Sequence, residues 1–267
     1  MTETIAGALP LGPAQLALAA LLVVLAGAIS MALQLGLERR LGIAAFRSVV
    51  QLLLVGYVLR YVFELESVTA VLGVALLMVA TASRESVRRA TRGVRGVSFD
   101  AFLTLLASSL LTTVLVTSVV VQVDPWYQPQ YLVPLLGMAL GNGLTGLSLC
   151  LDHLLESLDT RRAVIELELT LGATRWEAAR APLSAAVKRG IIPIVNSMSV
   201  AGVVSLPGMM TGQILAGADP VEAVKYQVVV MFLIAGATSL GCTLLAVLVF
   251  RRLFNDRHQL RWERIAR

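Results

Sequence analysis

The segment GATRWEAARAPL, residues 172–183, carries side chains suited to recognising a partner protein. Thr174 is followed three residues later by Glu177, the spacing of a capping box, in which hydroxyl and carboxylate each accept a hydrogen bond from a free backbone N–H. Trp176 falls in the first turn of that helix, where its large ring can fill a partner's pocket. Pro182 lacks the N–H that a continuing helix needs, so we expect a helix of about two turns. A short capped helix in a polar segment predicts a docking element.

The chain has no combination of residues typical of an enzyme. It contains no G-x-x-x-x-G-K-[ST] phosphate loop, and its two lysines, Lys188 and Lys225, lie outside any such context. We find no Ser–His–Asp or paired-carboxylate arrangement that would form a catalytic site. Cys150 and Cys242 fall within or at the end of apolar segments, which favours buried reduced thiols. We expect no catalytic residue and no cofactor in this chain, and we assign no metal ligands.

A second group of polar side chains interrupts the apolar segment 191–217. Pro207 is expected to free a backbone carbonyl one turn back, and Gly208 allows the chain to bend. Broken membrane helices occur where the freed groups face protein or a water-filled cavity, which is where transport sites lie. The alternative is that the glycines permit close helix packing and the methionines fill gaps. The candidate pathway residues are Asn196, Ser205, Pro207, Met209, Met210 and Gln213.

Two further amides, Gln51 and Asn142, lie inside apolar segments. Each is a candidate for contact with a transported solute, and each is equally explained as a hydrogen bond between helices worth ~1 kcal/mol. Arg47 lies near the N-terminal end of its segment and is expected to extend to the lipid headgroups. The run of arginines from Arg84 to Arg95 is expected to anchor the chain and to touch anionic lipid.

Composition places these residues in a membrane protein. Hydrophobic residues make up 57% of the 267 residues and charged residues only 15%, whereas a soluble domain has about 25% charged residues. The mean hydropathy is +0.80. The apolar runs approach or exceed the ~20 residues that cross a bilayer. None alternates as a barrel strand does, so we predict an all-α polytopic helical bundle. The approximate segments are 15–36, 43–62, 68–82, 101–123, 131–151, 191–217 and 223–250.

Basic residues indicate how the bundle is oriented. With seven spans, nineteen of the 22 lysines and arginines fall on one side, after the first, third, fifth and seventh spans. Because positive residues stay in the cytoplasm, we expect an outside N-terminus and a cytoplasmic C-terminus. The isoelectric point of 9.7 reflects this pattern, and we expect no nucleic-acid partner. Residues 1–267 then form one transmembrane domain in a cell (inner or plasma) membrane, surrounded by lipid, with a cytoplasmic loop at about 152–190.

Several strings resemble one transporter family. In ELELTLG, residues 166–172, Glu166 and Gly172 match the spacing of the E-A-A-x-x-x-G loop of ABC-transporter permeases, and Ala173 continues the match. The wider chain is similar to the Fet-type permeases, which include bacterial iron exporters and plant permeases linked to aluminium tolerance. The matching strings are FRSVVQLLLVGYVL (46–59), GMALGNGLTGLSL (137–149) and NSMSVAGVVSLPGMMTGQILAGADPVEAVKYQ (196–227).

The resemblance implies a permease subunit that pairs with a separate cytosolic ABC ATPase, which would bind ATP and Mg. Residues 166–183 would be its coupling segment, with contacts from Glu166, Gly172, Ala173, Thr174, Trp176 and Glu177. Leu167 and Glu168 depart from the loop's two small residues. The resemblance also implies a homodimer working with two ATPase copies.

The cargo stays open between two classes. Bacterial relatives imply export of iron or another metal species, and plant relatives imply a nucleotide sugar or another organic anion. Without histidines or paired thiols in the spans, a tight protein cage for iron is not expected. A secondary transporter that needs no ATPase is the competing class of function.

Overall fold

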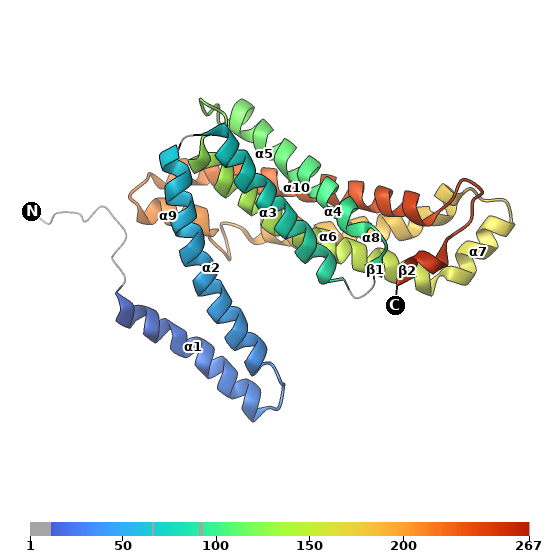
Figure 1. The fold of residues 1–267 in the computed structure, drawn as a ribbon, viewed down its shortest axis with the longest axis horizontal. Coiled ribbons are helices and arrows are strands. Elements are labelled where there is room, and N and C mark those ends of the chain that lie inside the picture. Colours follow the sequence, from blue (N-terminus) through green and yellow to red (C-terminus); the bar gives the residue numbers. More distant parts are fainter. Residues whose placement is uncertain (1–11, 66, 91–92, 267) are drawn as a thin grey trace, which may run out of the picture.

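The computed structural model describes residues 12–65, 67–90 and 93–266 and shows an all-α membrane fold. Figure 1 shows an elongated body of helices, from which a hairpin of two helices projects. The helices are α1 (Pro13–Ala32), α2 (Glu38–Leu65), α3 (Val68–Arg88), α4 (Val97–Leu105), α5 (Leu111–Leu115), α6 (Pro129–Thr160), α7 (Arg162–Thr170), α8 (Arg175–Val200), α9 (Gly208–Leu215) and α10 (Pro220–Leu253).

Six helical stretches in the described part of the chain are long and apolar enough to cross a membrane. They are α1, α2, α3, α6, α10 and the stretch Val97–Val120, in which α4 and α5 alternate with the π-helical turns Leu106–Leu110 and Val116–Val120. These stretches coincide with six of the seven predicted segments, although α3 and α6 extend well beyond the predicted ends at 82 and 151. The protein is therefore a multi-pass membrane protein. Glu66, Arg92 and Arg267, which belong to the charge clusters used to orient the chain, lie outside the described residues.

The remaining predicted segment, 191–217, has a different structure. Helix α8 begins at Arg175, runs through Pro182 and Pro193, and ends at Val200. The prediction that the capped helix stops after about two turns is therefore wrong. Pro182 is itself buried, and the turns around it pack against α6 and α10. Tertiary packing of this kind outweighs the backbone hydrogen bond that a proline removes.

The break that was expected at Pro207 occurs earlier in the chain. The carbonyl of Val200 accepts hydrogen bonds from the N–H groups of Val204 at 3.0 Å and Ser205 at 3.3 Å, and Gly202 adopts a φ of +82°. Pro207 is the last residue of the break and directly precedes α9, so it frees no carbonyl inside a helix. Its own carbonyl accepts from the Thr211 N–H at 3.1 Å. The interruption is a turn of seven residues between two helices, 201–207.

The predicted cytoplasmic loop at 152–190 is almost entirely helical. Helix α6 continues to Thr160, α7 follows after Arg161, and only residues 171–174 separate α7 from α8. The polar segment is therefore an extension of the bundle's own helices.

Small residues allow α6, α8 and α10 to approach closely. A Cβ added to Gly190 on α8 would lie 2.7 Å from the carbonyl oxygen of Gly146 on α6 and 2.6 Å from the Cys242 sulfur on α10. Close packing of small residues is how helices associate in lipid, where the hydrophobic effect does not drive them together. This contact fixes the positions of α6, α8 and α10 relative to one another.

A second link holds the residues after α10 against the body. The Arg252 guanidinium donates to both carboxylate oxygens of buried Asp100 at 2.6 Å. Beyond it, β2 (Ile265–Ala266) pairs antiparallel with β1 (Gly93–Val94). We call residues 254–264 the C-terminal segment. It is held between these two attachments.

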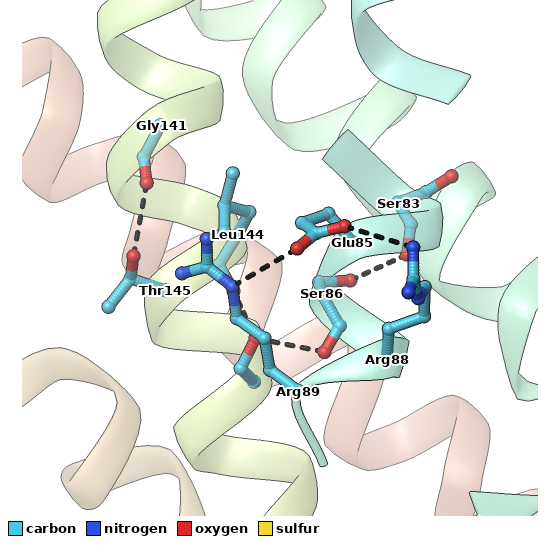
Figure 2. Close-up of polar contacts among 9 residues, drawn as sticks. Ser83, Glu85, Ser86, Arg88, Arg89, Gly141, Leu144 and Thr145 are labelled. Atoms are coloured by element: carbon cyan, nitrogen blue, oxygen red, sulfur yellow. Dashed lines mark hydrogen bonds and ion pairs between the residues drawn. The ribbon is translucent and has the colours of Figure 1, made fainter. Parts of the chain in front are cut away.

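Figure 2 shows the polar contacts between α3 and α6. Ser148 on α6 donates its hydroxyl to the carbonyl of Ser86 on α3 at 2.9 Å. Nearby, Glu85 forms ion pairs at 3.9 Å with both Arg88 and Arg89. Part of the arginine run that was expected to contact lipid is therefore paired within its own helix.

Candidate functional site

The α7–α8 corner, residues 166–177, reverses the chain direction at one end of the body (Figure 1). Helix α7 ends at Thr170, and Gly172 has a φ of +96°, a conformation that side chains with a Cβ rarely adopt. The Gly172 N–H donates to the Leu169 carbonyl at 3.2 Å, and the Ala173 N–H donates to the Glu168 carbonyl at 3.0 Å. These bonds satisfy carbonyls at the end of α7, as in a Schellman motif. Gly172 thus sets the angle of the corner.

The predicted capping box is confirmed at the start of α8. The Glu177 N–H donates to the Thr174 hydroxyl at 3.3 Å, and the Thr174 N–H donates to the Glu177 carboxylate at 2.8 Å. The Thr174 hydroxyl also donates to that carboxylate at 2.8 Å. The backbone and side-chain hydrogen bonds from Thr174 hold the pKa of Glu177 below its usual value. The carboxylate therefore stays ionised and fixes the first turn of α8.

Trp176 is partly anchored and partly exposed. Its ring meets Phe250 of α10 edge-on, with the ring centroids 5.3 Å apart, and Phe250 in turn contacts Phe254. About half of the Trp176 surface remains exposed, 51%. One side of the ring is thus tied to α10 while the other is available to a partner.

Glu166 is tied to the C-terminal segment, which the sequence analysis did not foresee. It accepts hydrogen bonds from Arg162 at 2.9 Å and from the Trp262 indole N–H at 3.0 Å. Arg162 also lies over the Trp262 ring, 4.7 Å from its centroid. The hydrogen bonds from Arg162 and Trp262 lower the pKa of Glu166. Three side chains thus form one cluster between α7 and the segment.

A second cluster joins the C-terminal segment to the start of α8. The Arg175 guanidinium pairs with Asp256 at 2.7 Å, and the Arg175 backbone N–H donates to Nδ1 of His258 at 3.0 Å. His258 therefore satisfies one of the backbone donors that every helix start leaves free. The sequence did not predict the contacts of Asp256, His258 and Trp262 with this corner, because each contact joins residues more than 80 positions apart.

Apolar side chains are exposed around the corner, beside charged side chains. Leu171 is 79% exposed, Leu167 is 58% exposed and Val164 is 45% exposed. Beside them, α7 and the C-terminal segment enclose a groove of about 550 Å³, lined by Glu166, Leu169, His258 and neighbouring residues. An exposed apolar patch with a polar rim is typical of a protein-binding surface. The corner therefore has the composition of a protein-binding surface.

The candidate pathway residues do not form one site. Gln51 on α2, Asn142 on α6 and Asn196 on α8 are all exposed, and Asn142 donates to the Met138 carbonyl of its own helix at 3.0 Å. Ser205 and Pro207 lie in the break between α8 and α9.

Helix α9 divides the rest of the candidate pathway residues between two pockets. Met209 and Gln213 line a pocket of about 420 Å³, while Pro207 and Met210 line one of about 370 Å³. Neither pocket includes Gln51, Asn142 or Asn196. Within the described residues, no group of three or more His, Cys, Asp or Glu side chains is placed to hold a metal ion.

The long apolar helices, the polar helical corner and the small pockets beside α9 define a multi-pass α-helical membrane protein. Comparison with known sequences gives its family. A family model described as "Uncharacterised protein family (UPF0014)" matches residues 13–254, so the chain belongs to this family.

Relatives in the family come from bacteria and plants. The chain is 39% identical to a UPF0014 membrane protein of Synechocystis over 81% of this chain and 84% of the relative. It is 33% identical to the Escherichia coli probable iron export permease protein FetB over 92% and 93% of the two chains. It is 32% identical to the Arabidopsis thaliana protein ALUMINUM SENSITIVE 3 over 91% and 88%. The resemblance to the Fet-type permeases is therefore confirmed. No solved structure matches the chain.

Proposed function

We propose that this chain is the membrane permease subunit of an ATP-driven exporter, and that a separate cytosolic ABC ATPase docks at the α7–α8 corner. The observation that carries the proposal is the exposed apolar surface of Leu167, Leu171 and Trp176 on a rigid, charged corner. A cluster of exposed apolar side chains with a polar rim is typical of a surface that binds another protein. The similarity to FetB, whose name describes a permease, supports the same assignment.

The corner is connected to two long helices of the bundle, so movement of the corner would displace both of them. Helix α8 has 26 residues, so it is about 39 Å long. It joins the corner at Arg175 to the break that follows Val200. Trp176 also contacts α10 through Phe250. An ATPase that pushes on the corner would therefore move the two helices that flank α9. ATP and Mg would bind to the ATPase and not to this chain.

Docking is tested by co-purifying the protein with a candidate cytosolic ABC ATPase. Changing Trp176→Ala together with Glu177→Lys removes the exposed ring and reverses the charge of the capping box. Loss of an aromatic residue at the centre of an interface weakens binding by roughly 30-fold or more. The matched control is Trp126→Ala, because Trp126 is also exposed but precedes α6 at the opposite end of that helix. Full recovery of the ATPase with the corner variant contradicts the proposal.

Two copies of the permease would form the working unit. Gln51 and Asn142 are exposed on α2 and α6, two of the helices that are long and apolar enough to cross a membrane, and amides facing hydrocarbon are unfavourable. A second copy can cover them and supply hydrogen bonds. Light scattering of the detergent-solubilised protein should therefore report two chains of 28.5 kDa each. A mass of one chain under conditions that preserve transport contradicts the dimer.

The proposed cargo is an iron species, in line with the name of FetB. The test places the permease and its ATPase in liposomes and follows ATP-dependent movement of radioactive iron, with a nucleotide sugar as the competing cargo. ATP-dependent movement of the nucleotide sugar but not of iron would contradict the proposed cargo and still support the ATP-driven mechanism. Solute flux that needs an ion gradient and no ATPase would overturn the mechanism in favour of a secondary transporter.

A further inference from the structure

A pocket between α6, α9 and α10 has the features of a site for a small organic molecule. Its volume is about 420 Å³, within the range of roughly 300–1,000 Å³ typical of small-molecule sites. It lies among the first turns of α6 and α10, far from the α7–α8 corner along both helices. Its polar or polarisable lining consists of Gln130, Tyr131, Met138, Met209, Gln213 and Tyr226.

Gln213 supplies a hydrogen-bond acceptor without a partner. Its side-chain carbonyl oxygen is buried and accepts no hydrogen bond within the described structure. A buried acceptor that stays unpaired costs roughly 1–3 kcal/mol. A native protein retains such a group where a ligand or a bound water completes it. The oxygen therefore favours a ligand that brings an O–H or N–H donor.

The rest of the lining excludes charged ligands. Among the residues that the structure describes, no Asp, Glu, His, Cys, Lys or Arg lines the pocket. Lys225, which precedes Tyr226 in the chain, is paired with Glu222 at 2.6 Å. The remaining wall consists of valines, a leucine and a proline. A bare cation or an anion would lose its hydration here without gaining a counter-charge.

We propose that this pocket binds an uncharged organic molecule with an apolar, ring-containing body and a donor group that reaches the Gln213 oxygen. The two tyrosine rings and the two methionines provide surfaces on which such a body packs. This site goes beyond the proposed function. Binding to it does not require the ATPase, so the two proposals can fail separately.

The experiment measures saturable binding of tritiated N-phenyl-1-naphthylamine to the purified protein in lipid nanodiscs without ATPase. This probe is neutral and aromatic and carries one N–H donor. The comparison probe, 1-phenylnaphthalene, has a similar body and no donor. Gln213→Leu should weaken binding of the first probe about 3- to 10-fold and leave binding of the second unchanged. Unchanged binding of the second probe also shows that the variant is folded.

Two further variants make the test specific. Gln15→Leu removes an exposed glutamine on α1, outside the pocket, and should change neither probe. Met138→Trp fills the pocket from α6 and should abolish binding of both. Absence of saturable binding to the unmodified protein overturns the proposal and leaves a pocket filled with water or lipid. An equal effect of Gln213→Leu on both probes also overturns it, because the donor would then contribute nothing.

Discussion

Trp262 donates its indole N–H to Glu166 across 96 positions of the chain, at 3.0 Å, and thereby fastens the C-terminal segment to α7. The contact matters because Glu166 is the first residue of the motif that resembles the permease coupling loop. The segment is therefore part of the surface presented at the corner. Its contribution can be tested without changing α7 itself.

Trp262→Phe should loosen the C-terminal segment. Phenylalanine keeps an aromatic face for Arg162 but loses the N–H that Glu166 accepts. The segment contains Arg257 and Arg261, so limited trypsin cleavage after these residues reports on its attachment. Cleavage should become up to about fivefold faster, since the lost bond is exposed and contributes modestly. Trp126→Phe should leave the rate unchanged. An unchanged rate in Trp262→Phe would mean that the other contacts suffice.

The capping box should give a defined pH dependence. The pKa of Glu177 is lowered in the folded protein, so its contribution to stability is complete above the pKa of the unfolded chain, about 4.3. It is lost as the pH falls through the lower, folded-state value. The difference in thermal stability between the native protein and Glu177→Gln should therefore be constant from pH 8 to about pH 5 and shrink below about pH 4. Glu168→Gln serves as the control. A difference that grows on acidification would exclude this role.

The close approach of α6 and α8 predicts opposite effects for two glycines. Gly190→Ala places a Cβ against the Gly146 carbonyl and the Cys242 sulfur, and should destabilise the protein by roughly 1–3 kcal/mol or more. Gly141→Ala on α6 meets nothing within 4 Å, and should be neutral or stabilising by up to about 1 kcal/mol because alanine favours helix. Unfolding in detergent measures both variants. Equal stability would show that the helices separate easily at this contact.

The ion pair of Asp100 with Arg252 should contribute strongly. Asp100 is buried, and Asp100→Asn removes the negative charge that pairs with the Arg252 guanidinium. The expected loss is about 2–3 kcal/mol, less than the roughly 3–5 kcal/mol of a fully buried pair, because Arg252 is partly exposed. A double-mutant cycle with Arg252→Met measures the coupling between the two side chains. Coupling near zero would assign the cost of Asp100→Asn to other contacts.

Features decided by neighbouring residues could be predicted from the sequence. The capping box of Thr174 and Glu177 involves residues three positions apart, so its spacing is sufficient evidence. The long apolar helices are likewise local, because each follows from the length of one hydrophobic run.

Features decided by packing were not predicted. The passage of α8 through Pro182 depends on α6 and α10, which the local sequence does not reveal. The contacts of Arg175 with Asp256 and His258 cross more than 80 positions, and surface side chains of this kind leave no periodic signal. The burial of the unpaired Gln213 oxygen depends on pocket residues of α6 and α10, which are far from Gln213 in the sequence. Residue type alone identified Gln213 as a candidate, but it did not predict the pocket that surrounds the side chain.

The C-terminal segment follows α10 in the chain, so the ribosome makes it after every membrane helix described. Until it emerges, Arg175 lacks Asp256 and His258, and Glu166 lacks Trp262. A nascent chain therefore exposes an incompletely supported corner while its helices enter the bilayer. Completion of the corner therefore follows synthesis of the described membrane helices, and this order would delay recruitment of the proposed ATPase until those helices have been made.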